Sequence, residues 1–85
     1  MKSPFHLTLV LPYEEVCLQV IPTQTISRVM AHITQKYSLA CPEKWVMFNR
    51  YKAWKMTLEE SLEDRRTLES IGLNKSCEIT IEQID

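Results

Sequence analysis

The sequence predicts an α+β fold in which one helix packs across a mixed β-sheet, and three patterns support this prediction. Residues 5–20 alternate between apolar and polar side chains on both sides of a short polar turn, which is typical of a β-hairpin. Residues 26–37 place apolar side chains at helical spacing, and residues 77–82 alternate again as a final strand. This order of elements makes the helix one layer and the sheet the other.

The composition indicates one small globular domain. The chain has 85 residues, 45% hydrophobic and 25% charged, which suits a single modest core. Its net charge is −1, so we expect no nucleic acid as a direct ligand. Pro4 and Pro12 bracket the short apolar run near the start, which argues against a signal peptide or a membrane span.

The predicted hairpin has one buried face. In its first strand the apolar residues of one parity are Phe5, Leu7, Leu9 and Leu11, with His6 and Thr8 opposite. Pro12 ends this run, and the second strand continues the alternation with Val16, Leu18 and Val20, with Cys17 and Gln19 opposite. Because side chains of one parity share a face of a strand, these two sets predict a sheet with one face in the core.

The helix is predicted to begin after Thr25, which is a suitable N-cap, and to end near Ser38. Its buried stripe comprises Ile26, Val29, Met30, Ile33 and Tyr37. A short strand follows Pro42, with Trp45 and Met47 expected toward the helix and Val46 and Phe48 away from it. In the last strand Cys77, Ile79 and Ile81 share one face, and the single glycine, Gly72, is placed in the turn before it.

The segment between the third and last strands carries a specific resemblance. Residues 62–68 read LEDRRTL, and this heptad differs at one place from the connector Leu-Glu-Asp-Gly-Arg-Thr-Leu of ubiquitin. The Thr25-Ile26 helix start, the buried helix spacing and Pro42 before the third strand also match that family. Over residues 24–83 the chain therefore resembles the ubiquitin-like (β-grasp) family.

The resemblance implies a ββαββ β-grasp roll as a single domain over residues 1–85. It also implies that the connector is a short helical or 3₁₀ turn that closes the core, with Leu62, Leu68 and Ile71 as its buried side chains. The chain departs from ubiquitin in having an insertion at about residues 49–61 and no Gly-Gly at its end. Because a conjugated tail ends in glycine, we expect a domain that is not itself conjugated.

The first candidate site is a partner-binding patch on the sheet face away from the helix. Val46 and Phe48 are expected there, since exposed apolar clusters with polar rims mark interaction sites. Tyr51 and Trp54 belong to the insertion, and aromatic residues of this kind anchor interfaces. For both pairs of residues an alternative to partner binding stays open, in which the insertion folds back and buries them.

The second candidate site is a basic row on the outer side of the helix. Arg28, His32 and Lys36 are spaced i, i+4 and i+8 and therefore share one line. Ras-association domains, which have the ubiquitin fold, meet a small GTPase with such a row beside their second strand. A third possibility is a scaffold subunit of a larger assembly, such as a ribonucleoprotein.

The sequence offers no enzyme chemistry. His6 and His32 have no carboxylate or serine at motif spacing, and one glycine excludes a glycine-rich phosphate loop. The three cysteines, Cys17, Cys41 and Cys77, share no metal-binding spacing. We therefore expect no catalytic residue, metal or cofactor, and an intracellular, monomeric domain with reduced thiols whose partners are other proteins.

Overall fold

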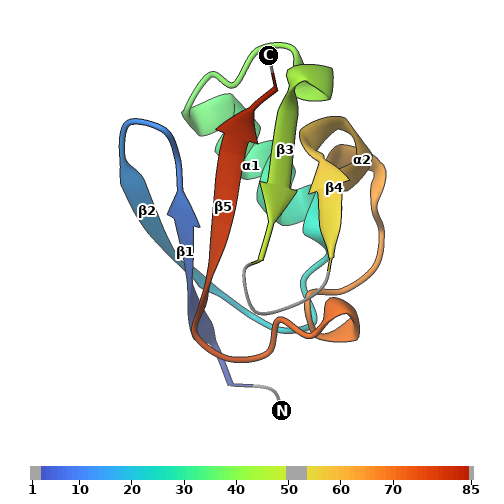
Figure 1. Cartoon of the computed structure of the whole chain (residues 1–85). Coiled ribbons are helices and arrows are strands. Elements are labelled where there is room, and N and C mark those ends of the chain that lie inside the picture. Colours follow the sequence, from blue (N-terminus) through green and yellow to red (C-terminus); the bar gives the residue numbers. More distant parts are fainter. Residues whose placement is uncertain (1–2, 50–53, 85) are drawn as a thin grey trace.

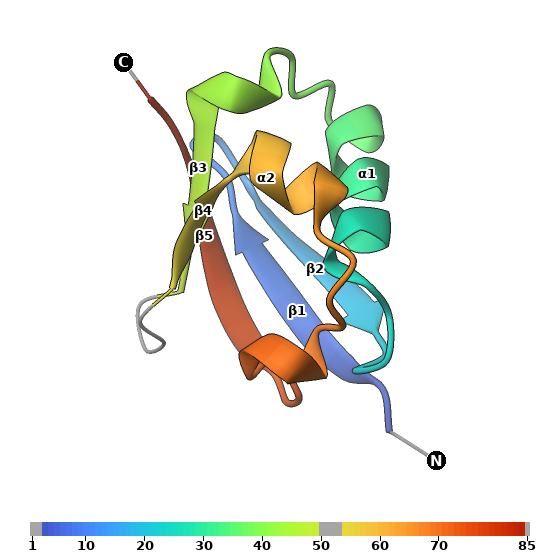
Figure 2. The same ribbon diagram turned by 90° about the vertical axis from the view of Figure 1, so that its right-hand side faces the viewer.

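A five-stranded mixed sheet with two α-helices on one side forms the computed structural model, which describes residues 3–49 and 54–84 (Figures 1 and 2). The strands are β1 (Phe5–Val10), β2 (Glu15–Val20), β3 (Trp45–Phe48), β4 (Lys55–Thr57) and β5 (Cys77–Gln83). The helices are α1 (Ile26–Lys36) and α2 (Leu58–Glu63), with 3₁₀ turns η1 (Pro42–Lys44) and η2 (Glu69–Ile71).

The strands lie in the order β2-β1-β5-β3-β4, which places the first and last strands side by side at the centre. β1 pairs antiparallel with β2 and parallel with β5, so the sheet is mixed. β3 pairs antiparallel with both β5 and β4. The predicted α+β fold with a mixed sheet and one main helix is confirmed.

The core lies between the sheet and the two helices, and the alternation in the sequence predicted it correctly. All four inward residues of the first strand are buried, as are Ile79 and Ile81 of β5 and Met47 of β3. α1 buries Ile26, Val29, Met30 and Ile33 as its helical spacing predicts, whereas Tyr37, the fifth residue of the predicted stripe, is half-buried at the C-cap. The register of β3 is also as predicted, because Met47 is 1% exposed while its neighbours Val46 and Phe48 are half-buried.

The connector holds the start of α1 in place. Thr25 is the predicted N-cap, and its Oγ1 accepts a hydrogen bond from the Arg28 N–H at 3.3 Å. Two more N–H groups at the start of the helix lack a partner within it, those of Ile26 and Ser27. They donate to the backbone carbonyls of Arg66 and Asp64, both at 2.9 Å. Since these N–H groups have no partner inside a helix, the connector supplies the partners that they need.

The buried residues of the connector differ in part from those expected. Leu68 is buried as predicted, but Leu62 and Ile71 are only half-buried at the edge of the core. Leu58 and Leu73, which were not among the expected buried residues of the connector, are fully buried. The reason is that the helix α2 begins at Leu58, before the predicted connector, which begins at Leu62. The residues that α2 turns toward the core are therefore Leu58 and Ser61.

The segment assigned to an insertion at about 49–61 supplies regular elements. Its described part contains β4, which pairs with β3, and the first residues of α2. Asn49 is buried just after β3, and its Nδ2 donates to the Glu78 carbonyl at 3.0 Å. Farther along, Gly72 lies before β5 as predicted, and its φ of 88° is in the left-handed region that glycine adopts most easily.

Candidate functional site

The outer face of the sheet, opposite α1 and α2, carries no helix among the described residues (Figure 2). Val46 and Phe48 both lie on this face, because they alternate with the buried Met47. Val46 is opposite Glu82 of β5 and Thr57 of β4, and Phe48 is opposite Thr80 and Lys55. The first pair of predicted site residues is therefore together on the uncovered face.

The register extends this apolar area to a residue that sequence reasoning missed. Thr80 lies between Phe48 on one side and Val10 of β1 on the other. All three are half-buried and share one row across the sheet. Val10 has the parity of His6 and Thr8, so the alternation already pointed to it, but the strand pairing was needed to bring it near Phe48. We call Val10, Val46, Phe48 and Thr80 the outer-face patch.

Trp54 of the insertion does not belong to the outer-face patch. Trp54 is half-buried and packs against the hydrophobic core, which is one of the two alternatives left open by the sequence. Its indole N–H is buried and has no hydrogen-bond partner among the described residues. Tyr51 lies outside the described residues, so its expected role stays a prediction.

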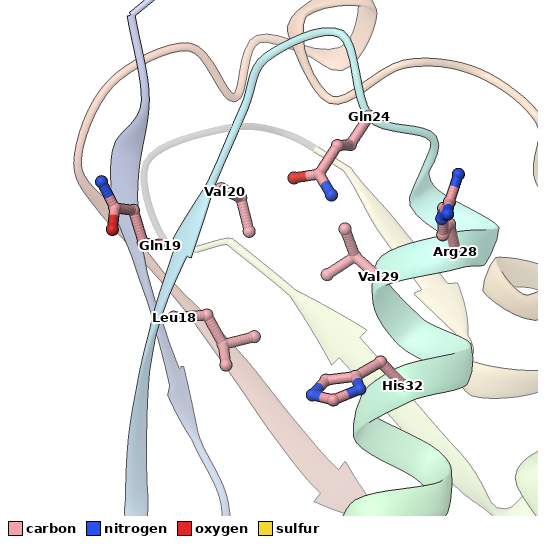
Figure 3. Close-up of a pocket in the computed structure, with 7 residues that line it drawn as sticks. All are labelled: Leu18, Gln19, Val20, Gln24, Arg28, Val29 and His32. Atoms are coloured by element: carbon pink, nitrogen blue, oxygen red, sulfur yellow. The ribbon is translucent and has the colours of Figure 1, made fainter.

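A groove lies between the edge strand β2 and α1 (Figure 3). Its volume is about 310 Å³, and seven residues line it: Leu18, Gln19, Val20, Gln24, Arg28, Val29 and His32. In Figure 3, Leu18 and Val29 point into the space between strand and helix, whereas Gln19 points away from it. The groove thus has an apolar floor and a polar rim.

The basic row on α1 is only partly associated with this groove. Arg28 and His32 are exposed and line it, but Lys36 is not among its lining residues. The Lys36 ammonium instead lies over the Tyr37 ring, 5.7 Å from the ring centre, within the range of a cation–π contact. Of the predicted row, Arg28 and His32 therefore lie at the groove and Lys36 lies beyond it.

The described residues contain no group of three or more His, Cys, Asp or Glu side chains placed to hold a metal ion. Over the described stretches, none of the helices has the length and apolar character required to cross a membrane.

The pKa of the Asp64 carboxyl is lowered, chiefly by hydrogen bonds from the Arg66 side chain, in a contact that supports the start of α1.

The strand order, with α1 across the sheet and a helical connector before β5, is the ubiquitin-like β-grasp fold. A solved ubiquitin-like domain of the Arabidopsis thaliana protein At2g32350 matches with a TM-score of 0.69 and 18% identity, over 98% of this chain and 80% of that chain. The ubiquitin of Caldiarchaeum subterraneum matches with a TM-score of 0.68 and 17% identity, over 98% and 96%. No protein-family model and no curated protein matches the sequence.

Proposed function

We propose that this chain is a ubiquitin-like domain that binds other proteins through the outer-face patch and is not itself conjugated. One observation carries the proposal: among the described residues no helix covers the outer face of the sheet (Figure 2), and strand pairing brings Val10 and Phe48 to either side of Thr80 on that face. A fold shared by many proteins does not define a task, so the proposal depends on this surface.

The surroundings of the patch are those of a protein interface. The row through Val10, Thr80 and Phe48 ends at Glu15 of β2 on one side and Lys55 of β4 on the other. Interfaces commonly have such an apolar centre and a charged rim, with aromatic residues contributing most of the binding energy. Phe48 is therefore the residue on which binding is expected to depend most.

A pull-down with matched variants tests this proposal. The wild-type domain, Phe48→Ala and a control, Gln35→Ala on the exposed side of α1, are immobilised and exposed to a cell extract, and the captured proteins are identified by mass spectrometry. We expect partners that wild type and the control retain and that Phe48→Ala loses. Partners captured equally by all three variants would contradict the outer-face patch.

Non-conjugation rests on the glycine content. The sequence has one glycine, Gly72, and it lies before β5, so no glycine pair follows the last strand in this sequence. An activating enzyme joins a C-terminal glycine carboxylate to AMP and then to its own cysteine. Incubation with ubiquitin-activating enzymes and ATP should therefore give no thioester, and a thiol-sensitive adduct on a gel would refute this part of the proposal.

A contact with a small GTPase is the second candidate, favoured by Arg28 and His32 beside β2. It ranks lower because the outward residues Cys17 and Gln19 of β2 add no positive charge. Charge reversal separates the candidates. If Arg28→Glu with Lys36→Glu abolishes capture of a GTPase, most strongly at low salt, this candidate gains over the outer-face patch. A scaffold role in a larger assembly would be visible in the same experiment as a set of co-captured subunits.

A further inference from the structure

We infer that the outer-face patch takes a basic amphipathic helix of another protein, laid across the strands with its N-terminus at β2 and its C-terminus at β4. This partner class rests on the proposed function, because it concerns the same surface. Three features of the described residues carry it: the spacing of the apolar side chains, the carboxylates on β5, and the opposite charges at the two ends of the row through Thr80.

The apolar side chains of the patch have the spacing of one face of a helix. Strand pairing places five outward residues in a row across the strands: Glu15, Val10, Thr80, Phe48 and Lys55. Neighbouring strands lie about 4.8 Å apart, so Val10 and Phe48 are about 10 Å apart with Thr80 between them. An α-helix rises about 10.5 Å over seven residues, so side chains i and i+7 of its apolar stripe can contact Val10 and Phe48 together.

Two exposed carboxylates of β5 lie on either side of this row. Glu78 and Glu82 share the outer face with Thr80, and each is two residues from it, about 7 Å along the strand. Among the described residues neither carboxylate has a salt bridge or a side-chain hydrogen bond. A helix on the row is about 10 Å wide, so lysine or arginine side chains on both of its flanks would reach these carboxylates. Such pairs favour a basic helix over an acidic one.

The ends of the row carry opposite charges, and these charges set the direction of the helix. Glu15 lies at the β2 end and Lys55 at the β4 end, and both are exposed. The N-terminus of a helix carries a positive partial charge and its C-terminus a negative one, so the N-terminus fits beside Glu15 and the C-terminus beside Lys55. Four strand spacings separate these residues, about 19 Å, which about 13 helical residues span.

A second copy of this chain fits the outer face less well. Face-to-face packing about a two-fold axis through Thr80 would place the β5 carboxylates of one copy against those of the other, whether the axis runs along the strands or across them. This arrangement of like charges opposes association. The expected occupant is therefore a partner that brings its own cations.

The probe is the peptide acetyl-Ala-Lys-Leu-Lys-Ala-Ala-Ala-Lys-Lys-Leu-Lys-Ala-Lys-amide, added to ¹⁵N-labelled protein and followed by NMR. We expect saturable shifts of the amides of Val10, of β3 and of residues 78–82, with no binding of the same peptide bearing glutamate for lysine. Glu78→Lys and Glu82→Lys should each weaken binding by about fivefold or more. Glu63→Lys, an equal charge change at an exposed position of α2, should leave it within about twofold.

A nitroxide label on the same peptide tests the direction of the helix. At the peptide N-terminus the label should broaden the amide signals of β2 more than those of β4, and at the C-terminus it should do the reverse. The opposite pattern would overturn the assigned direction, because the helix would then lie against the charges of Glu15 and Lys55.

Other results would overturn the basic helix as the partner. One is the absence of shifts at peptide concentrations up to about 1 mM, and another is binding that Glu78→Lys and Glu82→Lys leave unchanged. Sedimentation that shows a dimer abolished by Phe48→Ala would assign the face to a second copy. A folded NMR spectrum of each variant shows that lost binding does not come from unfolding.

The pull-down separates a failure of this inference from a failure of the proposed function. Captured proteins that Phe48→Ala loses but Glu78→Lys and Glu82→Lys retain would leave the outer-face patch as a binding site and exclude a basic partner. Captured proteins that all of these variants retain would overturn the patch itself. We expect captured proteins that all three substitutions lose and Glu63→Lys retains.

Discussion

Met47 and Phe48 are neighbours in the sequence and have opposite environments. Met47 is 1% exposed and lies in the core, while Phe48 is half-buried on the outer face beside Thr80 and Lys55. Because side chains alternate along a strand, a shift by one residue would exchange their roles. The sequence predicted this register from the position of Pro42, and the structure confirms it.

The two residues should therefore respond differently to truncation. Met47→Ala should lower the free energy of unfolding by roughly 2–5 kcal/mol, because it leaves a cavity in the core. Phe48→Ala should cost about 1 kcal/mol or less, and should weaken partner binding by about 2 kcal/mol if Phe48 is a hot spot. Urea unfolding of both variants measures the first effect, and a greater loss of stability for Phe48→Ala would contradict the assignment of faces.

Asp64 gives the stability a pH dependence. Its carboxylate accepts hydrogen bonds from the Arg66 side chain at 2.6 to 3.1 Å and from the Arg66 backbone N–H at 3.0 Å, and its pKa is lowered. Since the folded-state pKa is below the unfolded one, the contact stabilises the fold above the unfolded pKa of about 3.9. That stability is lost as the pH falls through the folded-state value.

Asp64→Asn tests this contribution, because asparagine keeps the shape and an acceptor oxygen but removes the charge. We expect a lower urea midpoint than wild type at pH 7, and a difference that shrinks as the pH falls through the lowered folded-state pKa of Asp64. Glu59→Gln, which removes a charge from an exposed position in α2, is the control. A difference that persists unchanged at low pH would mean that the charge is not responsible.

At the scale of elements, α2 was anticipated from the family resemblance but not at its true start. The start is marked by a capping box: Thr57 Oγ1 accepts from the Glu60 N–H, and Glu60 Oε1 accepts from the Thr57 N–H, both at 3.1 Å. A helix of six residues has little intrinsic stability, so its ends and its buried face matter more than its propensity.

Thr57→Ala should therefore destabilise the protein by about 1 kcal/mol, as for other lost N-caps. The measurement is the free energy of unfolding in urea, with the exposed Thr23→Ala as a control that makes no such cap. Thr57→Ser, which keeps the hydroxyl, should restore most of the loss. If serine proves as destabilising as alanine, the hydroxyl is not the stabilising group.

The sequence predicted long elements well and short ones poorly. β1, β2, β5 and α1 are long enough for alternation or helical spacing to be recognised, and all four are confirmed. β4 has three residues, too few for alternation, and its pairing with β3 depends on distant parts of the chain. For the same reason Val46 and Phe48 were found from strand parity, but Val10 and the groove beside β2 were not, because strand order decides what lies next to them.

At the scale of the whole molecule, the sheet has protected central strands and two dissimilar edges. β1, β5 and β3 each pair on both sides, whereas β2 and β4 each pair on one side within the described residues. The free energy needed to expose a backbone amide follows this pattern, since central strands open only in near-global unfolding. Amide exchange followed by NMR should therefore be slowest in β1 and β5 and fastest in β4, and a β4 as slow as β5 would show that its short pairing is stronger than its length suggests.

The parallel pairing of β1 with β5 also has a consequence for how the protein is made. Leu7 and Leu9 are paired with Cys77 and Ile79, so strands from opposite ends of the sequence form the centre of the sheet. A ribosome releases β1 first, and the hairpin must wait with one side of β1 unpaired until β5 has emerged. Folding therefore cannot be completed during translation of the first strands, and the nascent chain exposes its core leucines throughout that interval.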